Sequence, residues 1–193
     1  MALKKGRQIN HSDTIDLDTL ESIEPNKNHR QMLKYRYRGR RSKKIATVVL
    51  MNPSSASKEK ADNTIRRVED IVFHLFKRVG EVRVFNLFTV RGMNPKDVNE
   101  LYTKKGLSAL LYPETDDMLE QSILESEFAI AAWGGPCGLN KDLHAKRVEK
   151  THTIFKQAKK VYRIAGGHYA VDAAYPLHGR LWSYSMKAYS YKF

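Results

Sequence analysis

Two asparagines stand where buried strands are expected to end, and an amide side chain there can bind a water or the edge of a nucleobase. Asn52 follows the apolar run 45–51, and the proline after it biases Asn52 away from the helical region. Asn86 lies inside the apolar run 82–88, where a polar side chain is hydrogen-bonded or faces a ligand. An isolated Asn-Pro is more often a plain turn, and a backbone-bonded Asn86 is an equally good interpretation.

Two later loops add glycine, histidine and aromatic residues. Gly134 and Gly135 follow the apolar run 128–133, and their missing side chains permit close approach to a phosphate or sugar. The loop 175–182 gathers Tyr175, Leu177, His178, Arg180, Leu181 and Trp182. Such a loop can stack on a base, stabilise negative charge and insert an apolar side chain into a duplex. A histidine in a loop, taken alone, is more often a surface residue.

Other reaction types lack their signatures. The glycines do not have P-loop spacing, no G-x-S-x-G motif is present, and the histidines, carboxylates and single cysteine show no metal-ligand spacing. We therefore expect neither a metal nor an organic cofactor. Asp62 could act as a general base, but it precedes a helical pattern, and a helix N-cap is the preferred interpretation.

The charge points to a polyanionic partner. The 193 residues include 34 Lys and Arg against 21 Asp and Glu, a formal net charge of +13. Such an excess attracts nucleic acid, the alternative being a ribosome-like or merely soluble basic protein. Residues 33–38 alternate apolar and basic side chains, which predicts an edge strand with one basic face, or else a solvated basic tail. We expect four arginines of this region to contact DNA: Arg36, Arg38, Arg40 and Arg41.

Cysteine content and hydropathy indicate the compartment. The single cysteine, Cys137, excludes an internal disulfide framework and favours the cytoplasm. No apolar stretch follows the basic N-terminus, so we expect no signal peptide, and the longest apolar runs are only strand-sized. A monomeric cytoplasmic protein without a membrane partner is the resulting expectation.

From residue 45 onward, strand and helix patterns alternate. Strands are expected at 45–51, 82–88, 128–133 and 161–165, and helices at 65–79, 114–125 and 143–158. This alternation predicts a three-layer α/β/α fold around a central, mostly parallel four-stranded sheet, with functional groups in the loops after the strands. Residues 31–193 should form this single domain. Residues 1–30 should form an N-terminal arm, within which 11–25 could be a short helix.

These loops resemble two groups of proteins. Residues 31–185 are similar to a bacterial family of uncharacterised proteins with a Met-Asn-Pro-Ser signature, an Asp-x-Thr-x-x-Arg helix start, an Asn-Leu-Phe strand and a Trp-Gly turn. The residues that fit the last three motifs are Asp62, Thr64, Arg67, Asn86, Leu87, Phe88, Trp133 and Gly134. More distantly, the order of the loops resembles the uracil-DNA glycosylase superfamily, which implies a uracil-DNA glycosylase-like fold.

The second resemblance implies a base-excising DNA glycosylase. Asn52-Pro53 would be the water-activating loop, and Asn86, before Thr89-Val90-Arg91, would read a flipped base. His178 would stabilise the departing base, although Tyr175 stands where that superfamily leads one to expect the histidine. The resemblance further implies base contacts from Phe88, Trp133 and Tyr175, and DNA contacts from Arg91, Gly134, Gly135 and Arg180, with Leu177 or Leu181 as the wedge.

One departure from that superfamily concerns the substrate. Ser54 occupies the position at which the strict uracil enzymes have a tyrosine that excludes bulk at the 5-position of the base. The resemblance therefore implies a 5-modified pyrimidine, such as a hypermodified base of phage DNA, and a role in antiphage defence. Two other readings stay open: a non-catalytic nucleic-acid-binding protein, and a hydrolase or transferase that acts on free nucleosides or nucleotides.

Overall fold

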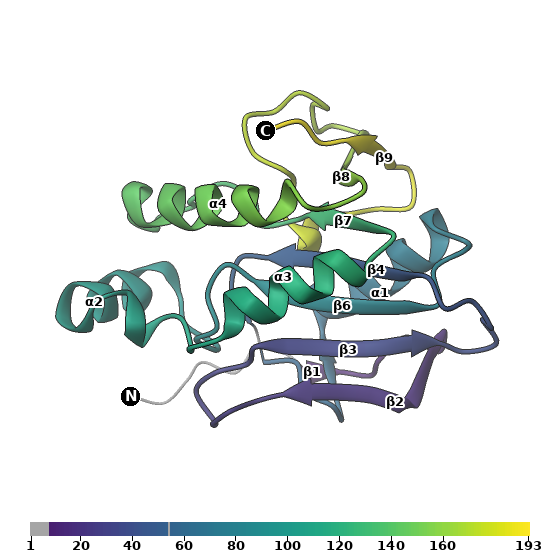
Figure 1. The fold of residues 1–193 in the computed structure, drawn as a ribbon, viewed down its shortest axis with the longest axis horizontal. Helices are drawn as coiled ribbons and strands as arrows, with labels where there is room; N and C mark the ends of the chain where they lie inside the picture. Colours follow the sequence, from purple (N-terminus) through teal and green to yellow (C-terminus); the bar gives the residue numbers. More distant parts are fainter. Residues whose placement is uncertain (1–7, 54) are drawn as a thin grey trace.

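The computed structural model describes residues 8–53 and 55–193, and most of its strands form one sheet (Figure 1). The order across this seven-stranded sheet is β2 (Ile15–Ile23), β3 (Met32–Tyr37), β6 (Glu81–Asn86), β4 (Ile45–Leu50), β7 (Phe128–Ala131), β8 (Val161–Ala165) and β9 (Lys187–Ser190). Two further short strands, β1 (Gln8–Ile9) and β5 (Ala61–Asp62), pair with each other.

The large sheet is mixed. Strand β4 runs parallel to both β6 and β7, and β7 runs parallel to β8. The pairs β2–β3, β3–β6 and β8–β9 are antiparallel, which makes three antiparallel pairings out of six. The predicted α/β class is confirmed. The four predicted strands occur as β6, β4, β7 and β8 and run parallel to one another. The sheet as a whole differs from the prediction, because β2, β3 and β9 add antiparallel pairings at its two sides and make it seven-stranded and mixed.

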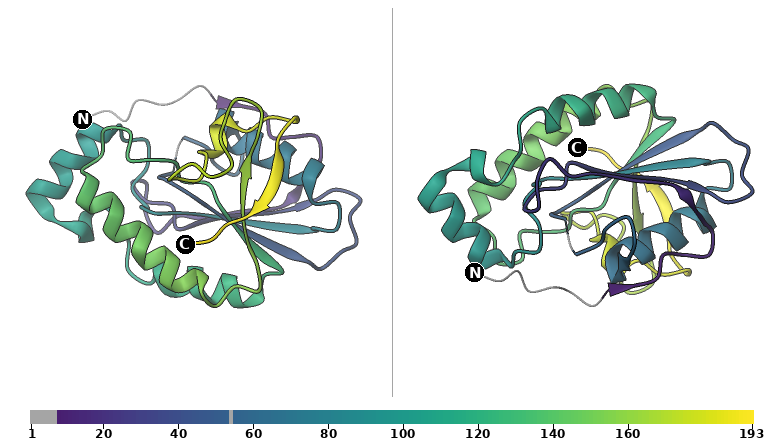
Figure 2. Two further views of the ribbon diagram at one scale, coloured as in Figure 1. Left: turned by 90° about the horizontal axis from the view of Figure 1, so that it is seen from above. Right: turned by 90° about the horizontal axis from the view of Figure 1, so that it is seen from below.

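Helices cover both faces of the sheet. Figure 2, seen along the sheet, shows α1 (Asn63–Leu75) on one face and both α3 (Thr115–Glu125) and α4 (Lys141–Phe155) on the other. The remaining helix, α2 (Pro95–Lys105), lies beyond the carboxyl ends of β4 and β6 (Figure 1). Two short 3-10 turns, η1 (Leu107–Ala109) and η2 (Gly179–Leu181), occur in loops. Within the described ranges, no helix is long and apolar enough to cross a bilayer.

The burial of β4 on both faces explains its unbroken apolar sequence. Val48 points into a core that includes Ile65 and Val68 of α1, whereas Val49 points into a second core that includes Leu119 of α3. Alternate side chains of a strand face opposite sides, so a central strand covered twice has no polar face. The apolar spacing in the sequence therefore predicted this strand to within one residue.

The region expected to be an arm contributes to the fold. Residues 8–30 contain β1 and β2, and β2 pairs with β3, so β3 is an internal strand rather than the predicted edge. His11 reinforces this attachment, because its Nδ1 lies 2.5 Å from the buried carboxylate of Glu69 in α1. The boundary that we placed at residue 30 therefore falls within a paired region. The acidic and polar pattern of 15–23 concealed a strand because only two of its nine residues, Ile15 and Leu20, are buried.

The strand order creates a crevice at one end of the sheet. From β4 the chain passes through α1 to β6 on one side, and from β6 it passes through α2 and α3 to β7 on the other side of β4. The loops that follow β4 and β7 therefore lead to opposite faces of the sheet. Ligand sites of open α/β sheets form at such a switch point, outside the carboxyl ends of the strands.

Candidate functional site

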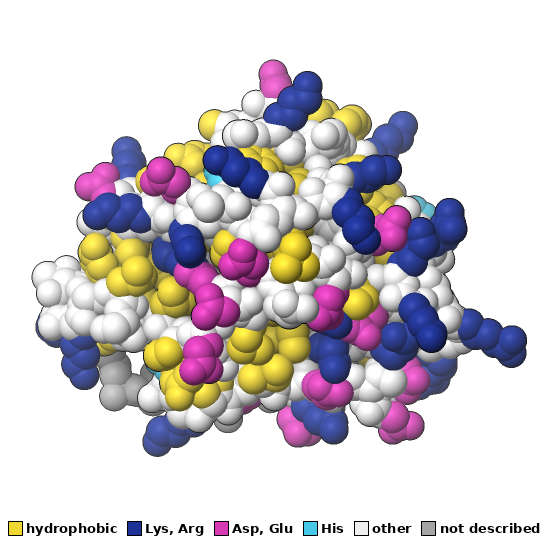
Figure 3. Space-filling model, viewed as in Figure 1, with side chains coloured by type: hydrophobic (Ala, Val, Ile, Leu, Met, Phe, Trp, Pro, Cys, Tyr) yellow, Lys and Arg dark blue, Asp and Glu magenta, His cyan; other side chains and the backbone are white. Residues whose placement is uncertain are grey.

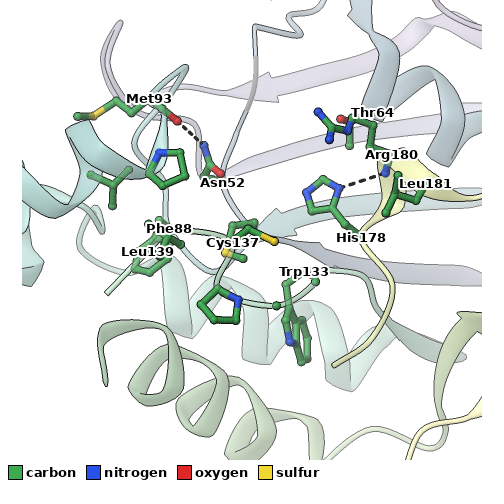
Figure 4. Close-up of a pocket in the computed structure, with 16 residues that line it drawn as sticks. Asn52, Thr64, Phe88, Met93, Trp133, Cys137, Leu139, His178, Arg180 and Leu181 are labelled. Carbon is green, nitrogen blue, oxygen red and sulfur yellow. Dashed lines mark hydrogen bonds between the residues drawn. The ribbon is translucent and has the colours of Figure 1, made fainter. Parts of the chain in front are cut away.

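A cavity of about 310 Å³ occupies this switch point. Residues after β4, β6 and β7 line it, together with the loop that contains η2; they include Asn52, Phe88, Gly134, His178 and Leu181. The volume lies in the range of small-ligand sites, and the wall is mainly apolar with a few polar groups (Figure 4). Loops that sequence analysis singled out separately therefore meet around one hollow.

Asn52 presents its amide to this cavity. Its Nδ2 donates to the carbonyl of Met93 at 3.3 Å, which fixes the orientation of the side chain. Figure 4 shows the amide oxygen on the other edge of the group, directed toward the open centre. An oriented carbonyl oxygen of this kind can accept a hydrogen bond from a water or from a ligand N–H.

His178 faces Asn52 from the opposite wall (Figure 4). Its Nδ1 accepts a hydrogen bond from the backbone N–H of Arg180 at 3.2 Å. Burial, and secondarily the positive charge of Arg180, lower the pKa of His178 to about 4, while Asp62 acts weakly in the opposite direction. The imidazole is therefore neutral at pH 7, and the accepting Nδ1 leaves the proton on Nε2, which can donate into the cavity.

The glycine turn after β7 packs closely against His178. Gly134 has a φ of +75°, and a Cβ built on it would lie 3.1 Å from the Cβ of His178. A Cβ on Gly135 would lie 3.2 Å from the ring of Tyr175, which in turn contacts His144 of α4 edge-on. Burial lowers the pKa of His144, against the opposing effect of its hydrogen bond to the backbone of Gly134. Tyr175 thus holds the turn from outside the cavity, rather than lining it as a base-binding residue.

The structure separates the two candidate wedge residues. Leu181 lines the cavity and is 40% exposed, so its side chain is available at the mouth. Leu177 packs against the core on the α1 side of the sheet. Of the two, only Leu181 is placed where it could enter a duplex.

Asn86 does not line this cavity. It is buried at the end of β6, opposite Leu50, and neither amide atom finds a hydrogen-bond partner in the described parts of the chain. We expected Asn52 and Asn86 to line one cavity, but only Asn52 does so. The second polar side chain of interest in this cavity is His178.

Two more buried polar groups lie at the same end of the sheet. Asp62 is the N-cap of α1, as preferred from the sequence: its Oδ1 accepts from the N–H groups of Thr64 and Ile65 at 2.9 and 3.0 Å. Its Oδ2 is buried without a partner among the described residues. Arg30 is fully buried. Of its guanidinium nitrogens only Nη1 donates a hydrogen bond to a described residue, the carbonyl of Ala56. Burial lowers the pKa of Arg30 to about 10. Unsatisfied buried groups of this kind are uncommon in folded proteins.

The aromatic residues and the proline that were candidates for binding a base mainly pack within the fold. Phe88 lines the cavity and is fully buried. Trp133 also borders the cavity, but its indole packs among Phe155 and Tyr191 in the second core and points away from the centre in Figure 4. Pro53 is buried, and its carbonyl accepts from the N–H of Gly92. Ser54 lies outside the described residues.

The arginines expected to bind DNA are not at the cavity. Arg36 pairs with Glu81, and Arg40 donates to three main-chain carbonyls around the end of α1 and lies 3.8 Å over the ring of Phe73. Arg38 and Arg41 are exposed, but they follow β3, at the opposite end of β4 from the cavity. Figure 3 shows basic and acidic side chains interspersed on the face that carries α3 and α4. Arg91 pairs with Glu24 and donates to the carbonyl of Ala56.

One part of the wall was not predicted from the sequence: it comes from the segment before and within α2. Met93, Pro95 and Val98 line the cavity there. The signal was present: Asn94 caps α2 by accepting from the N–H of Asp97, and proline occupies the first turn. An asparagine followed by proline is a common helix start.

Metal-binding residues do not gather in the described ranges, where no group of three or more His, Cys, Asp or Glu side chains could hold an ion. The search of curated proteins and the search of solved structures each returned no match. One family profile does match, over residues 30–177, which is most of the chain. The chain therefore belongs to the family described as "Protein of unknown function (DUF1643)".

Proposed function

We propose that this protein hydrolyses the N-glycosidic bond of a flipped-out pyrimidine nucleotide in DNA. The observation that carries the proposal is the placement of neutral His178 opposite Asn52, across a cavity at the switch point of the sheet. A flipped base needs a hollow with an apolar wall and a small number of oriented hydrogen-bonding groups. In this proposal the fold is of the uracil-DNA glycosylase type.

The reaction would consume one water. The bond between the sugar C1′ and the base nitrogen breaks, and its electron pair leaves with the base. The N–H at Nε2 of His178 donates to the resulting anionic base oxygen, whereas Asn52 orients the water that adds to C1′. The water oxygen bonds to C1′ and keeps one hydrogen as the new hydroxyl group, its other proton is released to solvent, and a proton from solvent neutralises the base. A neutral imidazole suits this role because it donates a hydrogen bond without having to transfer its proton.

We extend the proposal to the substrate and the setting. Ser54 in place of a tyrosine favours a pyrimidine with a substituent at the 5-position, as in hypermodified phage DNA. Defence against such phage, in the cytoplasm, is the biological role that fits. Asp62, with one carboxylate oxygen unpartnered among the described residues, is a second candidate for stabilising positive charge on the sugar.

One observation favours a different substrate for the same chemistry. Arg36, Arg40 and Arg91 are engaged within the fold, which weakens the case for an extended DNA-binding surface around them. A hydrolase that acts on free nucleosides would need no such surface. The two functions differ in whether the cavity is flanked by cations that are free to bind phosphate.

Variants of the two facing residues test the proposal. His178→Ala should lower the rate of base release from DNA by about 100- to 1000-fold, the usual effect of losing one preorganised donor. Asn52→Ala should abolish release while DNA affinity changes little. His168→Ala is the matched control, because His168 is exposed in a neighbouring loop. Full activity of both His178→Ala and Asn52→Ala would refute the assignment of the cavity.

A further inference from the structure

An open groove continues from the mouth of the cavity across the start of α1. It has a volume of about 580 Å³ and is lined by Ile9, Asn63, Arg66, Arg67, Asp70 and Arg180. Arg180 lines the cavity as well, so the groove and the cavity share a wall. Anything that extends from a ligand in the cavity past Arg180 therefore enters this groove.

Tight packing of η2 against α1 places Arg180 of η2 and Arg67 of α1 on the same groove. A Cβ built on Gly179 would lie 2.9 Å from the Cδ2 of Leu50 and 3.1 Å from the Cγ2 of Val68. Only a glycine allows the backbone to approach this closely. The next residue, Arg180, is consequently held beside the early turns of α1, where Arg67 projects.

The residues that line the groove have an excess of positive charge. Arg66 and Asp70 neutralise each other through a contact of 3.0 Å, and Arg66 also donates to the carbonyls of Asn10 and His11. Arg67 and Arg180 are both exposed, and within the described residues neither guanidinium forms an ion pair or hydrogen bond. Two positive charges on one small surface repel each other, and a bound anion would remove that cost.

We propose that Arg67 and Arg180 bind the phosphates of a nucleic-acid strand that flank the nucleotide in the cavity. This inference rests on the proposed function, and it deepens it by favouring a polynucleotide over a free nucleoside, which has no flanking phosphate. Arg180 would hold the phosphate nearest the cavity and Arg67 the next one along the groove. Arginine suits both positions, since its planar guanidinium can bind a phosphate through two parallel hydrogen bonds.

Binding measurements on single-stranded DNA without a cleavable base test the inference. Fluorescence anisotropy across a salt series should show that Arg67→Ala lowers affinity roughly 10-fold, as expected for the loss of a charge-assisted contact. The slope of log affinity against log salt should become shallower by about one unit. Arg78→Ala is the matched control, because Arg78 is exposed on the loop beyond the other end of α1. Equal affinity and slope in wild type, Arg67→Ala and Arg78→Ala would overturn the inference.

The failure of this inference is distinguishable from failure of the proposed function. Binding that depends on Arg67, with no base released from any DNA, would leave the groove assignment standing and refute the glycosidase. Base release from DNA, with an affinity and salt dependence that Arg67→Ala leaves unchanged, would do the reverse. His178→Ala should keep the binding and its salt dependence, since His178 contributes no charge at pH 7.

Discussion

Gly134 lies directly beneath His178: a Cβ atom added to Gly134 would come within 3.1 Å of the Cβ of the histidine. The two residues belong to loops that are more than forty positions apart in the chain, one after β7 and one before η2. The close packing of His178 against the backbone of Gly134 restricts the position of the imidazole at the cavity wall. The glycine is therefore part of the machinery that positions His178.

Gly134→Ala should impair catalysis more than folding. At a φ of +75° any side chain introduces backbone strain, and here the new methyl group would also displace His178 from its position opposite Asn52. We expect base release to fall by at least tenfold, which corresponds to about 1.4 kcal/mol of barrier. Gly39→Ala is a matched control with a φ of +73° and no atom within 4 Å of its added Cβ. Equal losses of activity in the two variants, measured at equal folded fraction, would show that Gly134 has only a backbone role.

The ionisation of His178 gives a second prediction. NMR titration should place its pKa near 4, because burial and the charge of Arg180 both disfavour the protonated ring. Arg180→Ala should raise this pKa part of the way toward the ordinary value of 6.5. A pKa of His178 near 6.5 in the wild type would contradict the buried, neutral imidazole on which the proposed chemistry depends.

The same shift predicts how stability depends on pH. The unfolded chain takes up a proton at residue 178 below about pH 6.5, whereas the folded chain resists doing so until about pH 4. His178 therefore lowers the free energy of unfolding as pH falls through this window. Urea denaturation of His178→Gln should show a shallower decline over that range than wild type.

Arg40 and Arg41 are adjacent in sequence and should differ sharply in stability measurements. Arg40→Ala removes the hydrogen bonds to the carbonyls of Phe73, Phe76 and Val79 and the contact with the Phe73 ring. We expect it to lower the free energy of unfolding by about 1–3 kcal/mol. Arg41→Ala, at an exposed position, should stay within about 0.5 kcal/mol of wild type. The reverse order in urea denaturation would mean that the Arg40 contacts carry no net energy.

Local patterns predicted the elements that bury apolar faces. The β8 strand occurs at its predicted bounds, β4 and α3 within one residue at either end, and the N-cap Asp62 before α1 is confirmed. β2 and β9 escaped prediction because few of their residues are buried, so their sequences lack a strong apolar alternation. Helix α2 was missed for a similar reason: Val98 is its single buried residue.

The candidate site was partly predictable. A loop after a buried strand has a known place in an α/β sheet, so Asn52, Gly134 and His178 could be expected near one another. The direction of a side chain is set by packing that sequence does not reveal, and Asn86 is accordingly not among the residues that line the cavity. Charge counts also could not distinguish Arg40, which is engaged with main-chain carbonyls, from Arg67, which is exposed in the groove.

Whether the cavity cleaves a glycosidic bond is decided by mass spectrometry of the products after incubation of the wild-type protein with DNA that carries plain or 5-modified pyrimidines. We expect a free pyrimidine base and an abasic site in equal amounts, with a 5-modified base released faster than uracil, and both products formed about 100- to 1000-fold more slowly with His178→Ala. Intact DNA in every reaction, from a folded protein that binds it, would contradict the claim that this cavity cleaves a glycosidic bond.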